Sequence, residues 1–106
     1  MSSYSLPPDT IVSRGPILLD LGAFEVKIGG RSVSLTRSEF DLLSHLVCAA
    51  PRVVSHRELV EVVLRSVYRA ETSVVRVHMF HLRKKLGEQH VIETVRSRGF
   101  RINPSL

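Results

Sequence analysis

The sequence predicts an α+β fold in which a small amino-terminal antiparallel sheet is followed by three helices and a carboxy-terminal β-hairpin. Three observations support this prediction. Apolar and polar residues alternate between residues 17 and 35, as they do in half-buried strands. Two helix-capping boxes and an amphipathic stretch follow between residues 36 and 87. Alternation returns at 92–103, where Ser97-Arg98-Gly99 interrupts it as a turn would.

The chain should form one folded domain preceded by a tail. Its 106 residues suffice for a single hydrophobic core but not for two. Residues 1–16 are rich in serine and proline and have little periodicity, which predicts a flexible tail or linker before the domain at 17–106. The single cysteine, Cys48, has no disulfide partner within the chain, and its apolar helical surroundings predict a reduced core residue.

The predicted strands of the amino-terminal sheet are short. They cover residues 17–21, 24–28 and 32–35, and apolar residues occupy alternate positions in the second and third. Gly29 and Gly30 separate these two strands. Glycine adopts positive φ without steric cost, so this pair predicts a tight hairpin between antiparallel neighbours.

Two capping boxes open the first two helices. In each box a hydroxyl residue, Thr36 or Ser55, precedes a glutamate by three positions, so the two side chains satisfy free backbone donors at the helix start. Pro51 ends the first helix after about four turns. The positions expected to face the core are Phe40, Leu43, Leu46 and Val47 in the first helix and Leu59, Val62 and Val63 in the second.

A third helix is expected from Thr72 or Ser73 to Leu86, with Gly87 suited to the positive-φ position beyond its end. At about 100° per residue, its buried stripe and its outward face separate. The stripe holds Val75, Met79, Leu82 and Leu86, the outward face holds Ser73, Val77, Phe80 and Lys84, and the flanks hold Arg76, His81, Arg83 and Lys85. The second and third helices thus predict a helix-turn-helix with an enlarged turn, and the closing hairpin makes it a winged helix.

The outward face of the third helix suits DNA. Val77 and Phe80 lie at its centre among basic residues. A helix in the major groove can place such groups against thymine methyls while its basic neighbours bind base edges or phosphates. An apolar centre with a charged rim is also typical of protein interfaces. A winged-helix protein-interaction module that uses Val77 and Phe80 is therefore the alternative.

The distribution of charge favours a polyanionic partner. The net charge is +5, and residues 71–106 contain seven basic residues against three acidic ones. A basic region of this kind is the electrostatic footprint expected of phosphate binding. We therefore expect double-stranded DNA as the partner.

Other classes of function are disfavoured. No apolar run approaches the roughly 20 residues of a membrane span, and the chain start lacks the order of a secretory signal, which predicts a cytoplasmic protein. His78 and His81 could share a metal ion, but no third ligand is identifiable and a structural zinc site needs about four. No catalytic triad, carboxylate pair or phosphate-binding glycine loop is recognisable. We expect neither an enzyme nor a cofactor.

Five segments, taken in order, resemble the OmpR/PhoB family. They are residues 35–43 (LTRSEFDLL), 54–59 (VSHREL), 77–78 (VH), 82–86 (LRKKL) and 94–101 (TVRSRGFR). The family consists of DNA-binding effector domains of two-component response regulators, the output proteins of a phosphorelay. The resemblance implies a four-stranded sheet, a third helix (72–86) in the major groove, and a wing (92–103) on the adjacent minor groove or backbone.

The resemblance also implies roles for individual residues. His78 and Arg83 would be backbone or positioning contacts, and Val77 would be an apolar base contact. Thr94 and Arg96 would be contacts from the wing. Together with the outward face of the third helix, this gives the candidate DNA-binding residues Ser73, Arg76, Val77, His78, Phe80, His81, Arg83, Lys84, Thr94, Arg96 and Arg98.

Further partners follow from the same resemblance. Segment 65–70 matches a family loop that often touches RNA polymerase, and recognition in the family usually pairs two domains on tandem half-sites. The family's receiver domain is not among these 106 residues. The serine- and proline-rich start is closer to a linker than to a native amino terminus, so an excised domain is favoured over a free-standing regulator.

The chain also departs from the family pattern. Arg76 replaces a common aspartate, Leu64 a usual tryptophan, and Ser97 the first glycine of the wing turn. Phe80 and His81 stand where basic or small polar residues are more typical. Three of these departures, at Arg76, Phe80 and His81, alter the reading surface itself. The base sequence preferred by relatives therefore does not transfer to this chain.

Overall fold

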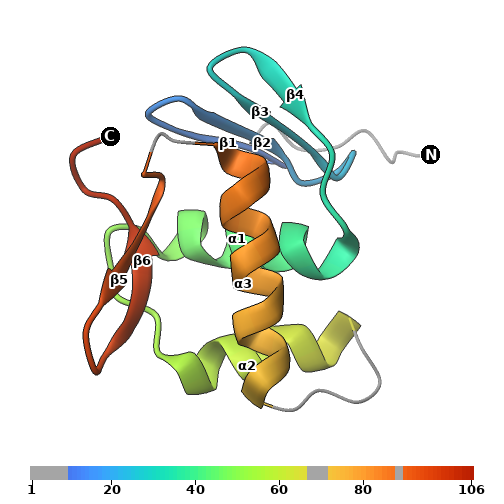
Figure 1. Cartoon of the computed structure of the whole chain (residues 1–106). Helices are drawn as coiled ribbons and strands as arrows, with labels where there is room; N and C mark the ends of the chain where they lie inside the picture. Colours follow the sequence, from blue (N-terminus) through green and yellow to red (C-terminus); the bar gives the residue numbers. More distant parts are fainter. Residues whose placement is uncertain (1–9, 67–71, 88–89) are drawn as a thin grey trace.

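The structure is a computed structural model that describes residues 10–66, 72–87 and 90–106, with the side chains of 64–66 and 72–74 left out. A sheet, three helices and a hairpin follow one another (Figure 1). The strands are β1 (Ile11–Arg14), β2 (Ile17–Asp20), β3 (Glu25–Ile28), β4 (Arg31–Val33), β5 (Ile92–Val95) and β6 (Gly99–Ile102), and the helices are α1 (Arg37–Ala49), α2 (His56–Ser66) and α3 (Thr72–Leu86). The expected α+β winged helix is confirmed.

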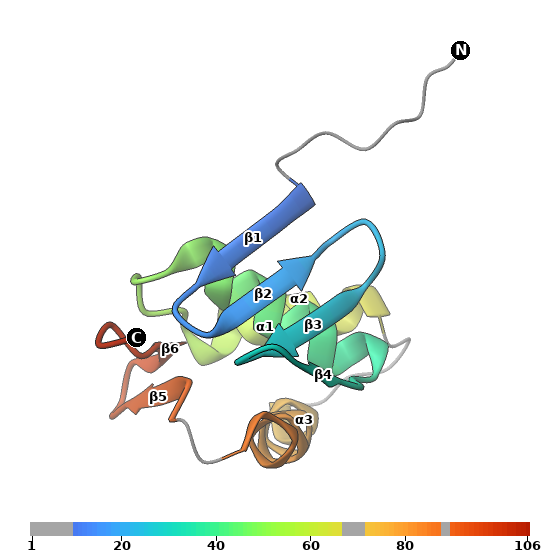
Figure 2. The ribbon, with the colours of Figure 1, turned by 90° about the horizontal axis from the view of Figure 1, so that it is seen from above.

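The amino-terminal sheet is antiparallel, in the order β1-β2-β3-β4, and covers α1 (Figure 2). Successive side chains of β2 point to opposite faces. Ile17 and Leu19 are buried against the helices, whereas Leu18 between them is 40% exposed. Gly29 and Gly30 both adopt positive φ in the predicted hairpin between β3 and β4.

The strand β1 shows that the boundary expected at residue 17 is wrong. The sequence pattern predicts a flexible tail for residues 11–14, but these residues pair with 17–20 in antiparallel register. β1 is an edge strand in which only Val12 packs against the core, while Ile11 is 52% exposed. Pairing by backbone hydrogen bonds leaves no trace in side-chain periodicity, which is why the sequence pattern missed it. Residues 1–9 lie outside the described residues.

The helix α1 begins as its capping box predicts. The amide of Glu39 donates to Oγ1 of Thr36 at 3.2 Å, and the amide of Thr36 donates to Oε1 of Glu39 at 2.9 Å. Cys48 is exposed, so its expected core position is wrong. Leu46 and Val47 are buried, and two residues further along a helix correspond to a rotation of about 200°, which turns Cys48 away from the core.

The second capping box forms only in part. The amide of Glu58 donates to Oγ of Ser55 at 3.1 Å, as predicted. The Glu58 carboxylate, however, accepts a hydrogen bond from Arg52 at 3.0 Å and contacts His45. These two interactions, Arg52 first, lower the pKa of Glu58 to about 2. Glu58 thus links α2 to the end of α1 and to the α1–α2 connection.

The helix α3 packs across both α1 and α2 (Figure 1). The predicted stripe of Val75, Met79, Leu82 and Leu86 is confirmed, since each of these residues is at most 3% exposed. An ion pair fixes α3 further, because Nζ of Lys85 donates to Oε1 of Glu39 at 2.7 Å. The core of the domain therefore determines which face of α3 remains outside.

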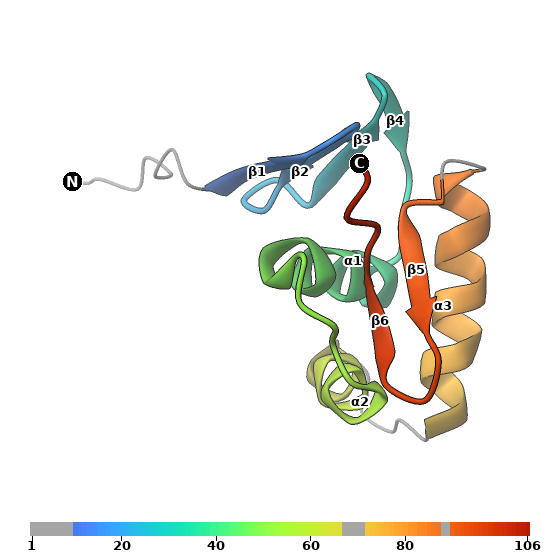
Figure 3. The ribbon, with the colours of Figure 1, turned by 90° about the vertical axis from the view of Figure 1, so that its left-hand side faces the viewer.

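The wing consists of β5 and β6, which pair from Ile92 with Ile102 to Val95 with Gly99. Figure 3 shows the hairpin running alongside α3. Two backbone hydrogen bonds between Val54 and Phe100, of 2.7 and 2.9 Å, attach the wing to the α1–α2 connection. The predicted turn is confirmed as the connection between the two strands, and Ser97 in it has a φ of 64°.

Candidate nucleic-acid interface

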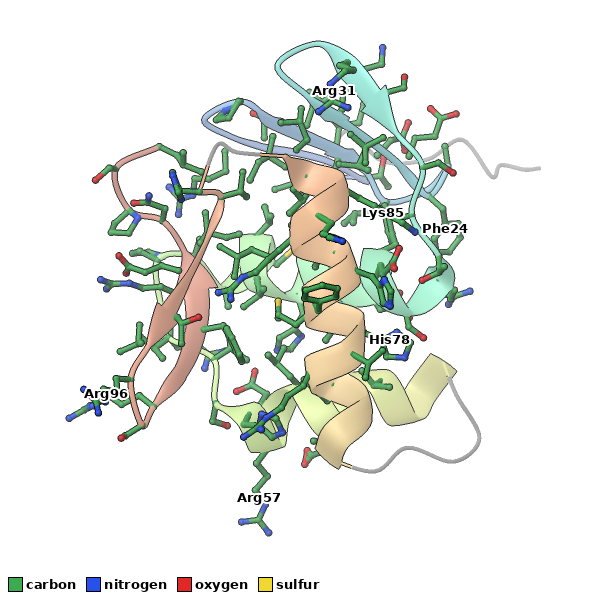
Figure 4. All side chains as sticks on the ribbon, viewed as in Figure 1. Phe24, Arg31, Arg57, His78, Lys85 and Arg96 are labelled. Carbon is green, nitrogen blue, oxygen red and sulfur yellow. The ribbon has the colours of Figure 1, made fainter. Side chains whose placement is uncertain are left out.

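The outward face of α3 is apolar at its centre. Val77 is 53% exposed and Phe80 is 57% exposed, as the helical wheel predicts. Large apolar side chains that project from a small domain indicate a contact surface when basic residues surround them. Figure 4 shows α3 in front of the other two helices, with the wing beside it.

A lysine and a histidine of α3 lie against the exposed ring of Phe80. Nζ of Lys84 lies 4.9 Å from the ring centroid, and the His81 ring meets the Phe80 ring edge-on with centroids 5.6 Å apart. Lys84, His81 and Arg76 are all exposed. These three residues were predicted to belong to the reading surface, and they lie on the outward side of α3.

Arg83 connects α3 to the wing. Its Nη2 donates to the carbonyl oxygen of Ile92 at 3.3 Å and to Oγ1 of Thr94 at 2.5 Å. The guanidinium also lies 5.3 Å from the centroid of the Phe100 ring. Its Nε is buried and has no hydrogen-bond partner among the described residues, and burial lowers the pKa of Arg83. Two predicted site residues, Arg83 and Thr94, thus bind each other and set the position of the wing relative to α3.

The wing turn presents two further predicted residues to solvent. Arg96 and Arg98 are both exposed, and Figure 4 shows Arg96 projecting away from the end of the hairpin. Arg101, by contrast, is paired with Glu93 across the wing at 2.5 Å. The turn therefore carries two arginines outward, while the third arginine of the wing stabilises the hairpin.

The remaining predicted positions lie away from the wing or outside the described residues. His78 is half-buried and lies on the side of α3 away from the wing (Figure 4). Ser73 belongs to the first turn of α3, but its side chain lies outside the described residues. Of the predicted polymerase-contacting segment 65–70, residues 65 and 66 end α2 and the rest lies outside the described residues.

A groove of about 380 Å³ lies between α3 and the wing. Apolar atoms form most of its surface, and basic residues are part of its lining. It is lined by Arg76, Met79, Phe80, Arg83, Lys84 and Phe100. Phe80 therefore belongs to this groove, whereas Val77 does not line it.

Arg57 is a candidate that sequence reasoning missed. It is exposed in the first turn of α2 and projects from the same end of the molecule as the wing turn (Figure 4). The free amides at a helix start favour phosphate, so a basic residue there suits a backbone contact. The sequence signal for such a contact is a basic residue inside the second capping box, where Ser55 and Glu58 flank Arg57.

Other site chemistries find no support in the described part of the chain. No group of three or more histidine, cysteine, aspartate or glutamate side chains there could hold a metal ion. No helix among the described residues is long and apolar enough to cross a membrane.

Comparison with known proteins gives consistent matches. Residues 30–102 match the family model described as transcriptional regulatory protein, C terminal. The chain is 40% identical over 101 residues to the transcriptional regulatory protein CutR of Streptomyces coelicolor, a match that covers 95% of this chain and 46% of CutR. It is 35% identical over 97 residues to the response regulator ArlR of Staphylococcus haemolyticus, covering 89% of this chain and 44% of ArlR. The chain thus spans less than half the length of these relatives.

A solved structure of a DNA complex is also similar. The RstA DNA-binding domain of Klebsiella pneumoniae, in complex with the RstA box, superposes with a TM-score of 0.73 at 32% identity, covering 89% of this chain and 97% of that one. The similarity therefore extends over nearly the whole length of the solved domain and most of this chain.

Proposed function

This chain belongs to the OmpR/PhoB-type family of carboxy-terminal DNA-binding domains of transcriptional regulatory proteins, and from that premise we propose how it engages duplex DNA. In the proposal, α3 enters the major groove and the wing contacts the adjacent minor groove or backbone. The family is one of transcription-regulator domains rather than of enzymes. Sequence-specific binding of this kind regulates transcription.

One observation carries the proposal: the single face of α3 that the core leaves outside is apolar at its centre and basic around it. Val77 and Phe80 are more than half exposed there. In the major groove, Val77 would meet a base edge, most favourably a thymine methyl group. The exposed Arg76 and Lys84 would bind phosphates or base edges on either side.

The wing supplies the second contact. Arg96 and Arg98 extend from its turn, and a guanidinium can enter a narrow minor groove, where the negative potential is enhanced. Thr94 and Arg83 hold the hairpin against α3. Helix and wing would therefore engage the duplex as one rigid unit.

A salt titration tests this proposal. Binding of the domain to a duplex, followed by fluorescence anisotropy, should weaken steeply as salt rises, because cations released from the DNA accompany each phosphate contact. The double variant Arg76→Ala/Arg96→Ala should lower the slope of log K against log salt by about 2. The control Lys27→Ala removes an exposed charge from the outer face of the sheet and should leave the slope unchanged. No duplex binding at about 50 mM salt would overturn the proposal.

The second candidate is a protein-interaction module, favoured by the exposure of Val77 and Phe80. In that case the basic rim would only orient a partner, and removing Arg76 and Arg96 would leave partner binding largely intact. The double variant therefore separates the two functions. Arg83 is unsuited to this test because its removal would also release the wing.

Further partners of the whole regulator are part of the proposal. We assign RNA polymerase contact to segment 65–70 and pairing of two domains to tandem half-sites. The relatives named response regulators act in two-component signalling, and a cytoplasmic location fits that role. Because the chain matches less than half of each relative, these assignments concern the protein to which such a domain belongs.

A further inference from the structure

The groove between α3 and the wing has a shape and a chemistry that the proposed reading of bases does not use. Its floor and walls include two aromatic rings and a thioether, from Phe80, Phe100 and Met79. Arg76 and Lys84 also line it. Met79 is 3% exposed, so the groove ends on the core of the domain and cannot be a passage.

The position of the groove determines which part of a bound duplex lies over it. This step rests on the proposed function, in which α3 occupies the major groove and the wing the adjacent minor groove. In duplex DNA one sugar–phosphate strand separates a major groove from the neighbouring minor groove. That strand must therefore pass between α3 and the wing, over the groove.

The lining matches such a strand. Deoxyribose presents C–H groups on its faces, and aromatic and thioether side chains bury these groups favourably. Each sugar is flanked by two phosphates, which require cations, and the lining residues Arg76 and Lys84 provide them. Neither ring is in open water on all sides, because Lys84 covers Phe80 at 4.9 Å and Arg83 lies over Phe100 at 5.3 Å.

We propose that the groove between α3 and the wing holds a deoxyribose of the bound duplex with its flanking phosphates, and that Phe80 contacts this sugar rather than a base. The sequence pattern placed Phe80 and Val77 together at the centre of the reading face. The structure separates them, because only Phe80 lines the groove. Val77 then reads a base, and Phe80 fixes the register of the backbone.

The variants Phe80→Ala and Val77→Ala form a matched pair. A sugar contact carries no sequence information, so Phe80→Ala should weaken binding to all duplexes alike, by about five- to tenfold. It removes no phosphate contact, so the salt slope should stay unchanged. Val77→Ala should instead relax the preference at one base pair in a selection from random duplexes. Both side chains are more than half exposed, so both variants should keep the unfolding midpoint of the wild type.

A modified duplex probes the sugar directly. A single 2′-O-methyl nucleotide, moved one position at a time along the bound strand, adds bulk to one sugar without changing its base or phosphate. One or two positions should weaken binding by the wild type, and the same positions should have no effect on Phe80→Ala. This coupling identifies the nucleotide that Phe80 contacts.

The outcomes separate the two proposals. If the wild type does not bind duplex DNA, the proposed function fails. If it binds and Phe80→Ala changes base preference while nonspecific affinity stays the same, Phe80 reads a base and the sugar proposal is wrong. If Phe80→Ala binds as tightly as the wild type, the groove lies outside the interface and the proposal is also wrong.

Discussion

Gly99 sets how closely the wing approaches the α1–α2 connection. Its φ is 147°, and a Cβ built on it would lie 2.0 Å from the carbonyl oxygen of Val54. That oxygen accepts the hydrogen bond from the amide of Phe100. Any side chain at Gly99 would therefore push apart the two backbones that attach the wing, and neither backbone is free to move without losing this bond.

We expect Gly99→Ala to lower the free energy of unfolding by at least about 2 kcal/mol, because steric overlap adds to the backbone strain at positive φ. Gly30→Ala is the matched control, since Gly30 also has positive φ but no atom within 4 Å of the added Cβ. Its cost should be limited to about 1 kcal/mol of backbone strain. Urea unfolding of the two variants measures the difference, and equal costs would show that the close contact with Val54 contributes nothing.

At the scale of residues, the sequence predicted which side chains of α3 are exposed better than it predicted which residues contact each other. The 3.6-residue period placed Val77 and Phe80 outside and Val75 and Met79 inside, and the structure confirms this. Periodicity describes one element alone, however. It could not show that Arg83 binds Thr94, because those residues lie on different elements and meet only through the fold.

The position of α3 relative to α1 depends on an ion pair whose carboxylate is nearly buried and whose lysine is exposed. The Glu39 carboxylate is 4% exposed and accepts hydrogen bonds from Lys85 and from the backbone of Thr36. Burial raises the pKa of Glu39, but these hydrogen bonds outweigh it and leave the pKa below its ordinary value of 4.5. One carboxylate thus caps α1 and anchors α3, so a change in its protonation reaches both helices.

This pair predicts a dependence of stability on pH. Because the pKa of Glu39 is lowered in the folded state, the unfolded chain binds the proton first as the pH falls. The stability that Glu39 contributes is therefore complete above its ordinary pKa of 4.5 and is lost as the pH falls through its folded-state value. Lys85→Met removes one of the hydrogen bonds that lower the pKa of Glu39, so burial raises that pKa with less opposition. The variant should therefore be less stable than the wild type near pH 7, and its free energy of unfolding should approach that of the wild type at low pH.

Urea unfolding between pH 7 and pH 3 measures this convergence. Glu58 also has a lowered pKa, but it is present in both proteins and cancels in the comparison. Lys84→Met is the matched control, since its ammonium group lies over Phe80 rather than on a carboxylate. The difference in free energy of unfolding between Lys84→Met and the wild type should stay constant from pH 7 to pH 3. A gap between Lys85→Met and the wild type that is constant with pH would contradict the role of Glu39.

At the scale of elements, helices were easier to predict than the sheet edge. The start of a helix can be predicted from residues close together in the sequence, such as Thr36 and Glu39 in the capping box of α1. The strand β1 has no such signal, because its pairing with β2 uses backbone groups and only Val12 packs against the core. Tertiary structure likewise determines the partner of Glu58. Its carboxylate pairs with Arg52 because of how α1 and α2 are arranged, and this partner cannot be predicted from the helix α2 alone.

For the whole molecule, the order of elements was sufficient to predict the winged helix, but not the surface between α3 and the wing. The groove exists because Arg83 holds the hairpin close to α3, while Gly99 lets the hairpin pack closely on the α1–α2 connection. Neither role is visible in the sequence pattern, since each involves a partner on another element. The candidate site was therefore predicted as a set of residues, and the structure shows which of them contact one another.

The size of the domain leads to the last prediction. One winged helix buries only roughly 600–1,000 Å² on DNA, so a single copy should bind a single site weakly. Two copies on tandem half-sites in the same orientation would lie on the same side of the duplex when the sites are about one helical turn apart, or 10 to 10.5 base pairs. Neighbouring domains could then contact each other, and we expect the second copy to bind at least about fivefold more tightly than the first.

Insertions between the half-sites test this arrangement. Five added base pairs rotate the second half-site by about half a turn to the opposite side of the duplex, which should abolish the gain. Ten added base pairs restore the side but move the copies apart by about a further 34–36 Å, so a gain that depends on direct contact should remain absent. Anisotropy titrations on the three duplexes give the two binding constants in each case. Equal constants on the uninterrupted site would show that two domains bind independently, and a gain restored by ten base pairs would show that the coupling passes through the DNA.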